Sequence, residues 1–212
     1  MESESLRVFD ESGNCVGVET REEIHKKGYW HETFHFWLVS REGGVEYIHF
    51  QLRSKQKKDY PNLLDITAAG HILATETVED GIREVKEEIG IDVSMRDLMP
   101  LGVIPYTNVH HELIDREFAH VFLLVRKYEM EDFILQPEEV SGMAKVRLDD
   151  MIELWKGKTE KVEADGFKMD SNGERAEWKE TLKKGHFVQH ENHFYLETFA
   201  AIKMKMEEIP YE

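Results

Sequence analysis

Residues 70–91 read GHILATETVEDGIREVKEEIGI, and this stretch decides the fold of the 212-residue chain. Apolar side chains recur in it at the spacing of one helix face, which predicts a helix over residues 78–89. The apolar stripe consists of Val78, Ile82, Val85 and Ile89. Gly90 follows directly and suits a helix end, because glycine readily adopts the left-handed conformation that closes many helices.

The same helix carries acidic residues on another face. Glu84, Glu87 and Glu88 are spaced i, i+3 and i+4, so their carboxylates lie side by side and away from the apolar stripe. Like charges this close repel one another. A bound divalent cation would remove that cost, since hard oxygen ligands are what Mg²⁺ prefers. A solvated charged face is the alternative interpretation of these three residues taken alone.

The flanking residues make the metal interpretation more specific. The segment resembles the Nudix box, G-x5-E-x7-R-E-U-x-E-E-x-G-U, in which U is a bulky aliphatic residue. Its fixed positions are filled by Gly70, Glu76, Arg83, Glu84, Val85, Glu87, Glu88, Gly90 and Ile91. Six residues instead of seven separate Glu76 from Arg83, which leaves the spacing of the later glutamates intact and the role of Glu76 open.

This resemblance implies a fold, a cofactor and an activity. The fold is the Nudix fold of the α+β class, an α/β/α sandwich with a mixed β-sheet. The cofactor is Mg²⁺ or Mn²⁺, held by Glu84, Glu87 and Glu88 together with the carbonyl of Ala69, while Arg83 orients the carboxylates. The activity is that of a MutT-like hydrolase, which cleaves a diphosphate linkage in a nucleoside diphosphate derivative or a similar organic diphosphate.

The chemistry of the residue types agrees with that activity. Divalent ions neutralise phosphate oxygens and lower the pKa of bound water, and a nearby carboxylate then takes the proton. For this base we consider Glu87 and Glu117 ahead of the pair Glu138–Glu139. Arg53 and Lys57 belong to a basic loop and are candidates for binding the substrate phosphates. A solvated loop explains these two cations equally well.

A second resemblance, over about residues 5–150, is to isopentenyl-diphosphate isomerase, a branch of the same superfamily. It is carried by His31–Leu38, Ala69–His71 and Asp115–Glu117. By this resemblance a second divalent metal is held by His25, His31, His71, Asp115 and Glu117. The isomerase needs a cysteine where this chain has Ala69, and the single cysteine is Cys15. We therefore favour the hydrolase; the alternatives are an isomerase-like enzyme and a non-catalytic Nudix-fold binding module.

The rest of the chain predicts strands around one central helix. We expect hairpins within residues 6–19 and 35–52, strands at 63–70, 101–106, 118–125 and 142–146, and helices at 148–155 and 194–206. These elements do not alternate regularly, which is typical of the α+β class. The predicted organisation is one domain over residues 1–212, with a core of about 5–156 and a helical C-terminal extension of about 157–212.

Composition excludes several functional classes. The chain has 27 Lys and Arg against 43 Asp and Glu, a net charge of −16, so nucleic-acid phosphates would repel it. A small anionic substrate stays compatible, because a metal ion reverses the local field. No apolar run approaches the roughly 18 residues that span a membrane, and a single cysteine suits a reducing compartment. We expect a cytoplasmic protein; dimers are frequent in the resembled family, so a homodimer is compatible with the sequence.

Overall fold

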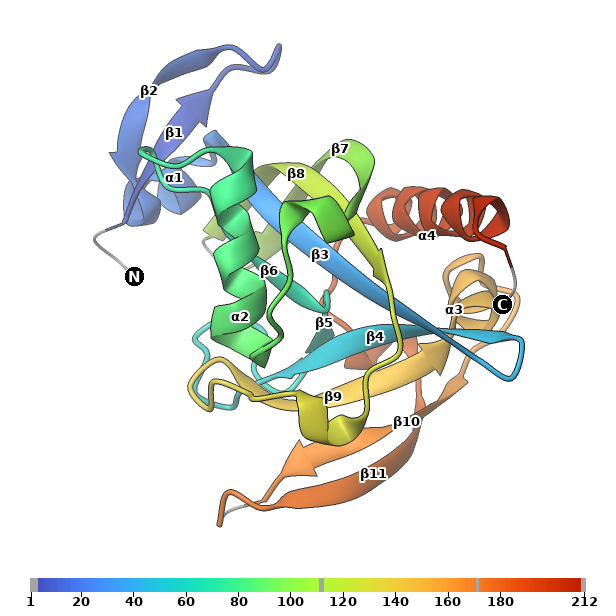
Figure 1. The fold of residues 1–212 in the computed structure, drawn as a ribbon. Helices are drawn as coiled ribbons and strands as arrows, with labels where there is room; N and C mark the ends of the chain where they lie inside the picture. Colours follow the sequence, from blue (N-terminus) through green and yellow to red (C-terminus); the bar gives the residue numbers. More distant parts are fainter. Residues whose placement is uncertain (1–3, 111–112, 171, 211–212) are drawn as a thin grey trace.

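The computed structural model describes residues 4–110, 113–170 and 172–210 (Figure 1). Its strands are β1 (Ser5–Phe9), β2 (Cys15–Thr20), β3 (Trp30–Glu42), β4 (Val45–Arg53), β5 (Leu64–Asp65), β6 (Ala68–His71), β7 (Met99–His110), β8 (Leu113–Val125), β9 (Val140–Arg147), β10 (Val162–Met169) and β11 (Arg175–Leu182). Its α-helices are α1 (Arg21–Lys27), α2 (Arg83–Ile89), α3 (Leu148–Trp155) and α4 (Asn192–Glu208). Short 3₁₀ turns complete it at η1 (Val78–Ile82), η2 (Met95–Asp97), η3 (Met130–Asp132) and η4 (Lys184–His186).

A mixed sheet is built around β3. This strand pairs antiparallel with β4 and β6 and parallel with β8, and the sheet continues from β4 through β9 and β10 to β11. The parallel register places His31 beside Glu117, and the antiparallel register places Thr33 opposite His71. Residues from three distant segments therefore meet near the start of β3.

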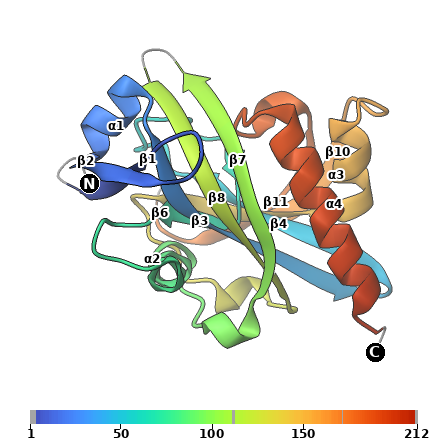
Figure 2. The same ribbon diagram turned by 90° about the horizontal axis from the view of Figure 1, so that it is seen from above.

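Both faces of β3 are covered, because successive side chains of a strand point to opposite faces. Trp37 and Val39 pack into the core that includes α3 and α4, whereas Phe36 and Leu38 pack into the core that includes α2. Figure 2 shows α2 on one side of the sheet and α3 and α4 on the other. The predicted α+β fold, an α/β/α sandwich with a mixed sheet, is confirmed.

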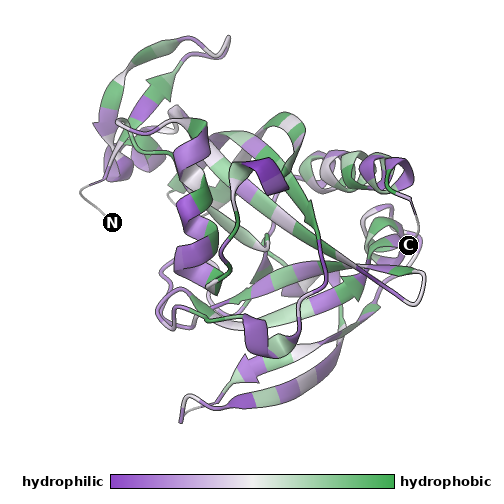
Figure 3. Ribbon diagram, viewed as in Figure 1, coloured by the Kyte–Doolittle hydropathy of each residue, from purple (hydrophilic) through white to green (hydrophobic). Residues whose placement is uncertain are grey.

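The segment expected as one helix, residues 78–89, consists of η1 followed by α2. Val85 and Ile89 are fully buried in the core, while the outward face of α2 is hydrophilic (Figure 3). Gly90 ends the helix with a φ of 74°, as the sequence predicts. The strand expected over 63–70 is divided into β5 and β6, so the chain turns before it reaches α2.

The expectation of a helical extension after residue 157 is wrong. β10 and β11 form an antiparallel hairpin that pairs with β9 and lengthens the sheet. Along β10, Val162 and Ala164 are buried and Glu163 is exposed, so the hydropathy alternates with the period of a strand. Gly166 allows β9 to lie close, since a Cβ at that position would be 2.0 Å from a carbonyl oxygen of β9.

The core boundary expected near residue 156 is also wrong. Phe187, Phe194 and Phe199 are fully buried in the same core as Trp37. The helix expected over 194–206 is present as α4, and it covers the sheet instead of extending away from it (Figure 2). Among the described residues, no helix combines the length and the apolar character needed to cross a membrane.

Candidate active site

A cavity of about 320 Å³ opens where β3, β6, β8 and α2 meet. Its wall is completed by the loop after β4 and by residues close to α4, including His190. Most of the lining side chains are charged or polar. The cavity thus collects the box glutamates, two of the predicted histidines (His25 and His71) and the predicted phosphate-binding cations in one place.

The box glutamates lie at one side of the cavity. Burial raises the pKa of Glu88 to about 8, and the charge of Glu84 adds to the shift. Burial also raises the pKa of Glu84 to about 7, against the opposing effect of Arg83. Glu88 accepts hydrogen bonds from Gln51 Nε2 (2.9 Å) and from the amide of Ala69 (3.1 Å). Glu84 and Glu88 are desolvated and therefore resist ionisation, and a divalent cation beside them would stabilise their ionised forms. These residues therefore fit Mg²⁺ or Mn²⁺.

Gly70 brings Glu84 close to the backbone of β6. A Cβ at Gly70 would lie 2.1 Å from Cδ of Glu84, so only glycine leaves room for this carboxylate. Glu87 is different, since 54% of its side chain is exposed at the mouth of the cavity. The cluster therefore contains one buried carboxylate, Glu88, one half-buried carboxylate, Glu84, and one that water reaches freely.

Arg83 connects these carboxylates. It donates from Nε and Nη2 to the two oxygens of Glu76 (2.7 and 3.2 Å), and from Nη1 to Glu84 and to Glu87, the latter at 3.3 Å. Nη2 also donates to the carbonyl of His71 (3.2 Å). Glu76 therefore meets Arg83 despite the shorter spacing in the box.

Glu117 is held from several directions. Its Oε2 accepts hydrogen bonds from the hydroxyls of Thr33 (2.6 Å) and Tyr106 (2.7 Å), and His35 Nε2 lies 3.0 Å away. Burial would raise the pKa of Glu117, yet the hydrogen bond with His35 holds that pKa well below its ordinary value. Glu117 is thus a fixed, ionised carboxylate.

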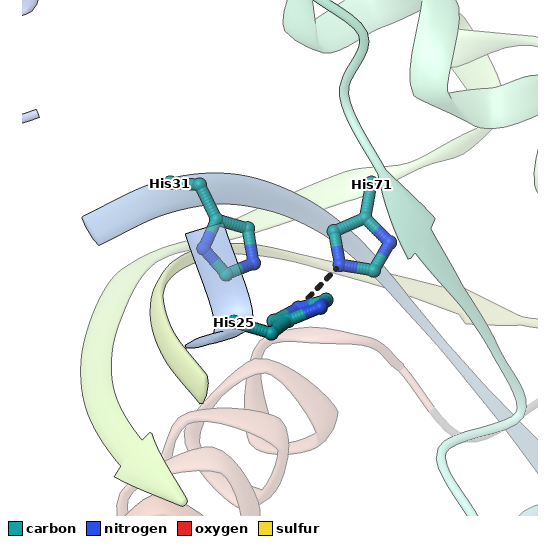
Figure 4. Close-up of side chains that lie close together, drawn as sticks. All are labelled: His25, His31 and His71. Atoms are coloured by element: carbon teal, nitrogen blue, oxygen red, sulfur yellow. Dashed lines mark hydrogen bonds between the residues drawn. The ribbon is translucent and has the colours of Figure 1, made fainter. Parts of the chain in front are cut away.

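The predicted histidines converge on one another (Figure 4), and His31 also lies close to Glu117. His25, His31 and His71 come from α1, β3 and β6, and their candidate ligand atoms lie within 4.8 Å of one another. Asp115 Oδ1 lies 3.4 Å from Nε2 of both His25 and His31. His31, Asp115 and Glu117 meet the same 4.8 Å criterion.

Two buried atoms of this cluster, His31 Nε2 and Asp115 Oδ1, have no hydrogen-bond partner among the described residues. Burial lowers the pKa of His71 well below its ordinary value, so that ring is neutral and offers a lone pair. Buried polar atoms left without partners are costly. Neutral imidazoles and carboxylates in this arrangement fit Zn²⁺ or Mn²⁺.

The predicted phosphate-binding cations line the cavity but are engaged with the protein. Arg53 Nη1 donates to Asp65 Oδ2 (2.8 Å), and its Nε and Nη2 donate to the carbonyl of Asp59 (3.1 and 2.9 Å). Lys57 forms an ion pair with Glu139. Both cations are therefore held in place at the wall.

Several site residues escaped the sequence analysis. Thr33 and His35 share the strand face of His31, and their i, i+2, i+4 alternation could have identified them. Tyr106 is buried and donates its hydroxyl to Glu117. His190 contacts Asp65, which lies 125 residues earlier in the sequence. No local sequence pattern predicts this contact.

Comparison with known proteins agrees with this geometry. The family model described as "NUDIX domain" matches residues 30–165. The chain belongs to the Nudix hydrolase family. A Nudix hydrolase of Clostridium acetobutylicum is 40% identical over 92% of this chain and 95% of that protein. The confirmed resemblance thus covers the fold and the box.

Two further comparisons concern an isomerase and a solved structure. An isopentenyl-diphosphate isomerase of Aliivibrio fischeri is 31% identical over 66% of this chain and 78% of that enzyme, so the second resemblance is also real. A crystal structure from Deinococcus radiodurans, 21% identical, superposes with a TM-score of 0.55 over 73% of this chain and 90% of that one. The latter likeness supports the fold.

Proposed function

We propose that this Nudix hydrolase cleaves a diphosphate linkage in a nucleoside diphosphate derivative or a similar organic diphosphate, with Mg²⁺ or Mn²⁺ held by Glu84, Glu87 and Glu88. The observation that carries the proposal is the pair of desolvated carboxylates, half-buried Glu84 and buried Glu88, whose pKa values desolvation raises to about 7 and 8 beside a polar cavity. Carboxylates that are desolvated in this way are stabilised in their ionised form when they bind a divalent cation.

When bound, the ion neutralises phosphate oxygens and lowers the pKa of a coordinated water. The protein's own residues then divide the remaining work. Arg83 fixes Glu84 and Glu87, and Arg53 at the end of β4 and Lys57 in the following loop hold the diphosphate. Glu87, which is exposed to water, takes the proton. Glu117, the other candidate base, is a weak proton acceptor, because the hydroxyls of Thr33 and Tyr106 donate to it.

Activity on a substrate panel tests the proposal. The protein is incubated with Mg²⁺ and a panel of nucleoside diphosphate conjugates, sugar diphosphates and prenyl diphosphates, and phosphate-containing products are separated. We expect hydrolysis of at least one member that stops when EDTA is added. Tight binding of a panel member without turnover would instead support a non-catalytic binding module.

A second divalent ion at the histidine cluster belongs to the same proposal. The unpartnered His31 Nε2 and Asp115 Oδ1 support it. Metal analysis of protein purified without chelator should show a tightly held ion in addition to exchangeable Mg²⁺. His31→Ala and Glu117→Ala should lose that ion; a His31→Ala protein with the native metal content would contradict this part.

Isomerase activity is the alternative that the relatives raise. It needs a thiol where this chain has Ala69, while Cys15 is exposed on β2 and does not line the cavity. We therefore expect no conversion of isopentenyl to dimethylallyl diphosphate. An NMR assay that detects the conversion at enzymatic rates would overturn this expectation.

A further inference from the structure

The segment between β11 and α4 closes one wall of the cavity. The amide of Val188 donates to the carbonyl of Leu64 at 2.8 Å, which fixes this segment alongside β5. The hydroxyl of Tyr195 donates to the carbonyl of Val188 at 2.9 Å. Both Val188 and His190 line the cavity, although they lie beyond residue 165, where the family match ends.

His190 is held firmly in this wall. Only 8% of its side chain is exposed. Its ring packs edge-on against Tyr106, with centroids 5.2 Å apart and planes at 89°, and it lies 5.1 Å from the ring of Phe194. A histidine packed in this way has one orientation.

That orientation directs Nε2 at Asp65. Nε2 lies 3.0 Å from Asp65 Oδ1, and the other carboxylate oxygen, Oδ2, accepts from Arg53 Nη1 at 2.8 Å. Burial would raise the pKa of Asp65, but the hydrogen bond from His190 and the charge of Arg53 lower it. Asp65 is therefore ionised, and His190 donates Nε2–H to it.

Arg53 stands at the end of this chain of contacts. Its guanidinium also donates from Nε and Nη2 to the carbonyl of Asp59. Together with the contact to Asp65, these hydrogen bonds fix the orientation of the guanidinium. A guanidinium binds a phosphate strongly when its fork is already oriented. If Asp65 shifts, Arg53 loses the contact that sets its direction.

We propose that His190 is a positioning residue which, through Asp65, orients Arg53 toward the diphosphate of the substrate. The proposal rests on the proposed function, in which Arg53 contacts that diphosphate. By this proposal, the C-terminal segment contributes to substrate binding as well as to the hydrophobic core.

The test separates KM from kcat. With the substrate found in the panel, His190→Ala should raise KM about tenfold and leave kcat within about twofold, since one charge-assisted contact is weakened outside the reacting atoms. His190→Gln should recover most of the native KM, because its Nε2 amide can donate to Asp65. His193→Ala, at an exposed histidine of the neighbouring helix, should behave as the native protein.

A double-mutant cycle identifies the route. In an Arg53→Ala background, His190→Ala should add less than twofold to KM, because the residue through which it acts is gone. A full tenfold increase in that background would overturn the proposal, and so would a native KM in the single variant. If His190→Ala does not fold, Asp65→Asn in the native and Arg53→Ala backgrounds provides the same comparison.

Binding of inorganic diphosphate keeps the inference separate from the proposed function. Calorimetry with Mg²⁺ and inorganic diphosphate should show native binding weakened about tenfold by His190→Ala, whether or not a hydrolysed substrate is known. Equal affinities of native protein and variant would refute the role of His190 and leave the hydrolase proposal intact. Absence of binding to the native protein would refute both the role of His190 and the assignment of Arg53.

Discussion

Glu88 carries a carboxylate into a part of the molecule where water is largely excluded. Only 7% of the residue is exposed, and its hydrogen bonds come from neutral donors, Gln51 and the amide of Ala69. Such a group is costly to ionise unless a cation lies beside it. The cost is consistent with a site built for a metal ion and is difficult to explain as a packing feature.

Replacement of this group should separate stability from activity. Glu88→Gln should leave the melting temperature unchanged or higher, because the amide resembles the protonated acid that burial favours. It should lower kcat by about a hundredfold or more, since loss of a metal ligand removes several kcal/mol of transition-state stabilisation. Steady-state kinetics and thermal unfolding check both results. Glu79→Gln, at an exposed position of η1, is the control; native turnover by Glu88→Gln would contradict the metal assignment.

His49 supplies a pH dependence away from the cavity. Burial, with a further effect of Lys145, lowers its pKa from 6.5 to about 4. In the folded protein the ring therefore stays neutral down to about pH 4, while in the unfolded chain it binds a proton below pH 6.5. Its contribution to stability is fully present above pH 6.5 and is lost as the pH falls toward 4, by about 3 kcal/mol in total.

Urea unfolding measured from pH 7 to pH 4 checks this difference. The free energy of unfolding of the native protein should fall more steeply over this range than that of His49→Gln, which keeps a polar group beside Ser40 but does not titrate. Parallel curves for the two proteins would show that His49 does not titrate as its burial implies. Carboxylates away from His49 titrate in both proteins and cancel from the comparison, whereas Glu42 interacts with His49 and does not cancel fully.

At the scale of elements, the junction of β6 and α2 depends on Gly70. A Cβ there would meet Cδ and Oε1 of Glu84, at 2.1 and 2.2 Å. These atoms are the far end of a side chain that can rotate away, so Gly70→Ala should fold with a nearly native melting temperature. The displaced carboxylate should lower both the affinity for Mg²⁺ and kcat by about tenfold or more.

Calorimetric titration with Mg²⁺ and kinetics measure the two effects of Gly70→Ala. Gly17→Ala is the matched control, because a Cβ at Gly17 has no neighbour within 4 Å and that glycine has no left-handed backbone. A Gly70→Ala protein with native metal affinity would show that the position of Glu84 against β6 is not required.

The elements also show which features the sequence can predict. The apolar stripe and the glutamate spacing of residues 78–89 are local, so α2 and its acidic face could be placed from the sequence alone. The strands β10 and β11 could not, because seven of their sixteen residues are charged and their structure depends on pairing, β11 with β10 and β10 with β9. Tertiary pairing decides such segments, and local propensity does not.

The candidate site divides in the same way. His25, His31 and His71 could be predicted because a family resemblance places them, and the pairing of β3 with β6 and β8 brings them together. The contact of His190 with Asp65 depends on how the whole chain folds back on the sheet. It had no signal in the sequence.

At the scale of the whole molecule, the C-terminal part and the catalytic part share one core. Phe199 of α4 lies fully buried, with ring centroids 5.9 Å from Trp37 of β3 and 6.2 Å from Trp155 of α3. A core that joins β3 to α4 couples their unfolding, because neither side can open without exposing the other. We therefore expect residues 1–212 to unfold as one cooperative unit.

Phe199→Ala tests this coupling. It should lower the free energy of unfolding by about 3–5 kcal/mol, the usual cost of removing a buried phenylalanine side chain. Tryptophan fluorescence and far-UV circular dichroism should give the same single transition for the native protein, and the variant should shift both together. Met204→Ala, on the same helix but 66% exposed, should change stability by less than about 0.5 kcal/mol. Two separate transitions, only one of them moved by Phe199→Ala, would mean that α4 folds apart from the sheet and that His190 is held to the cavity more weakly than its contacts indicate.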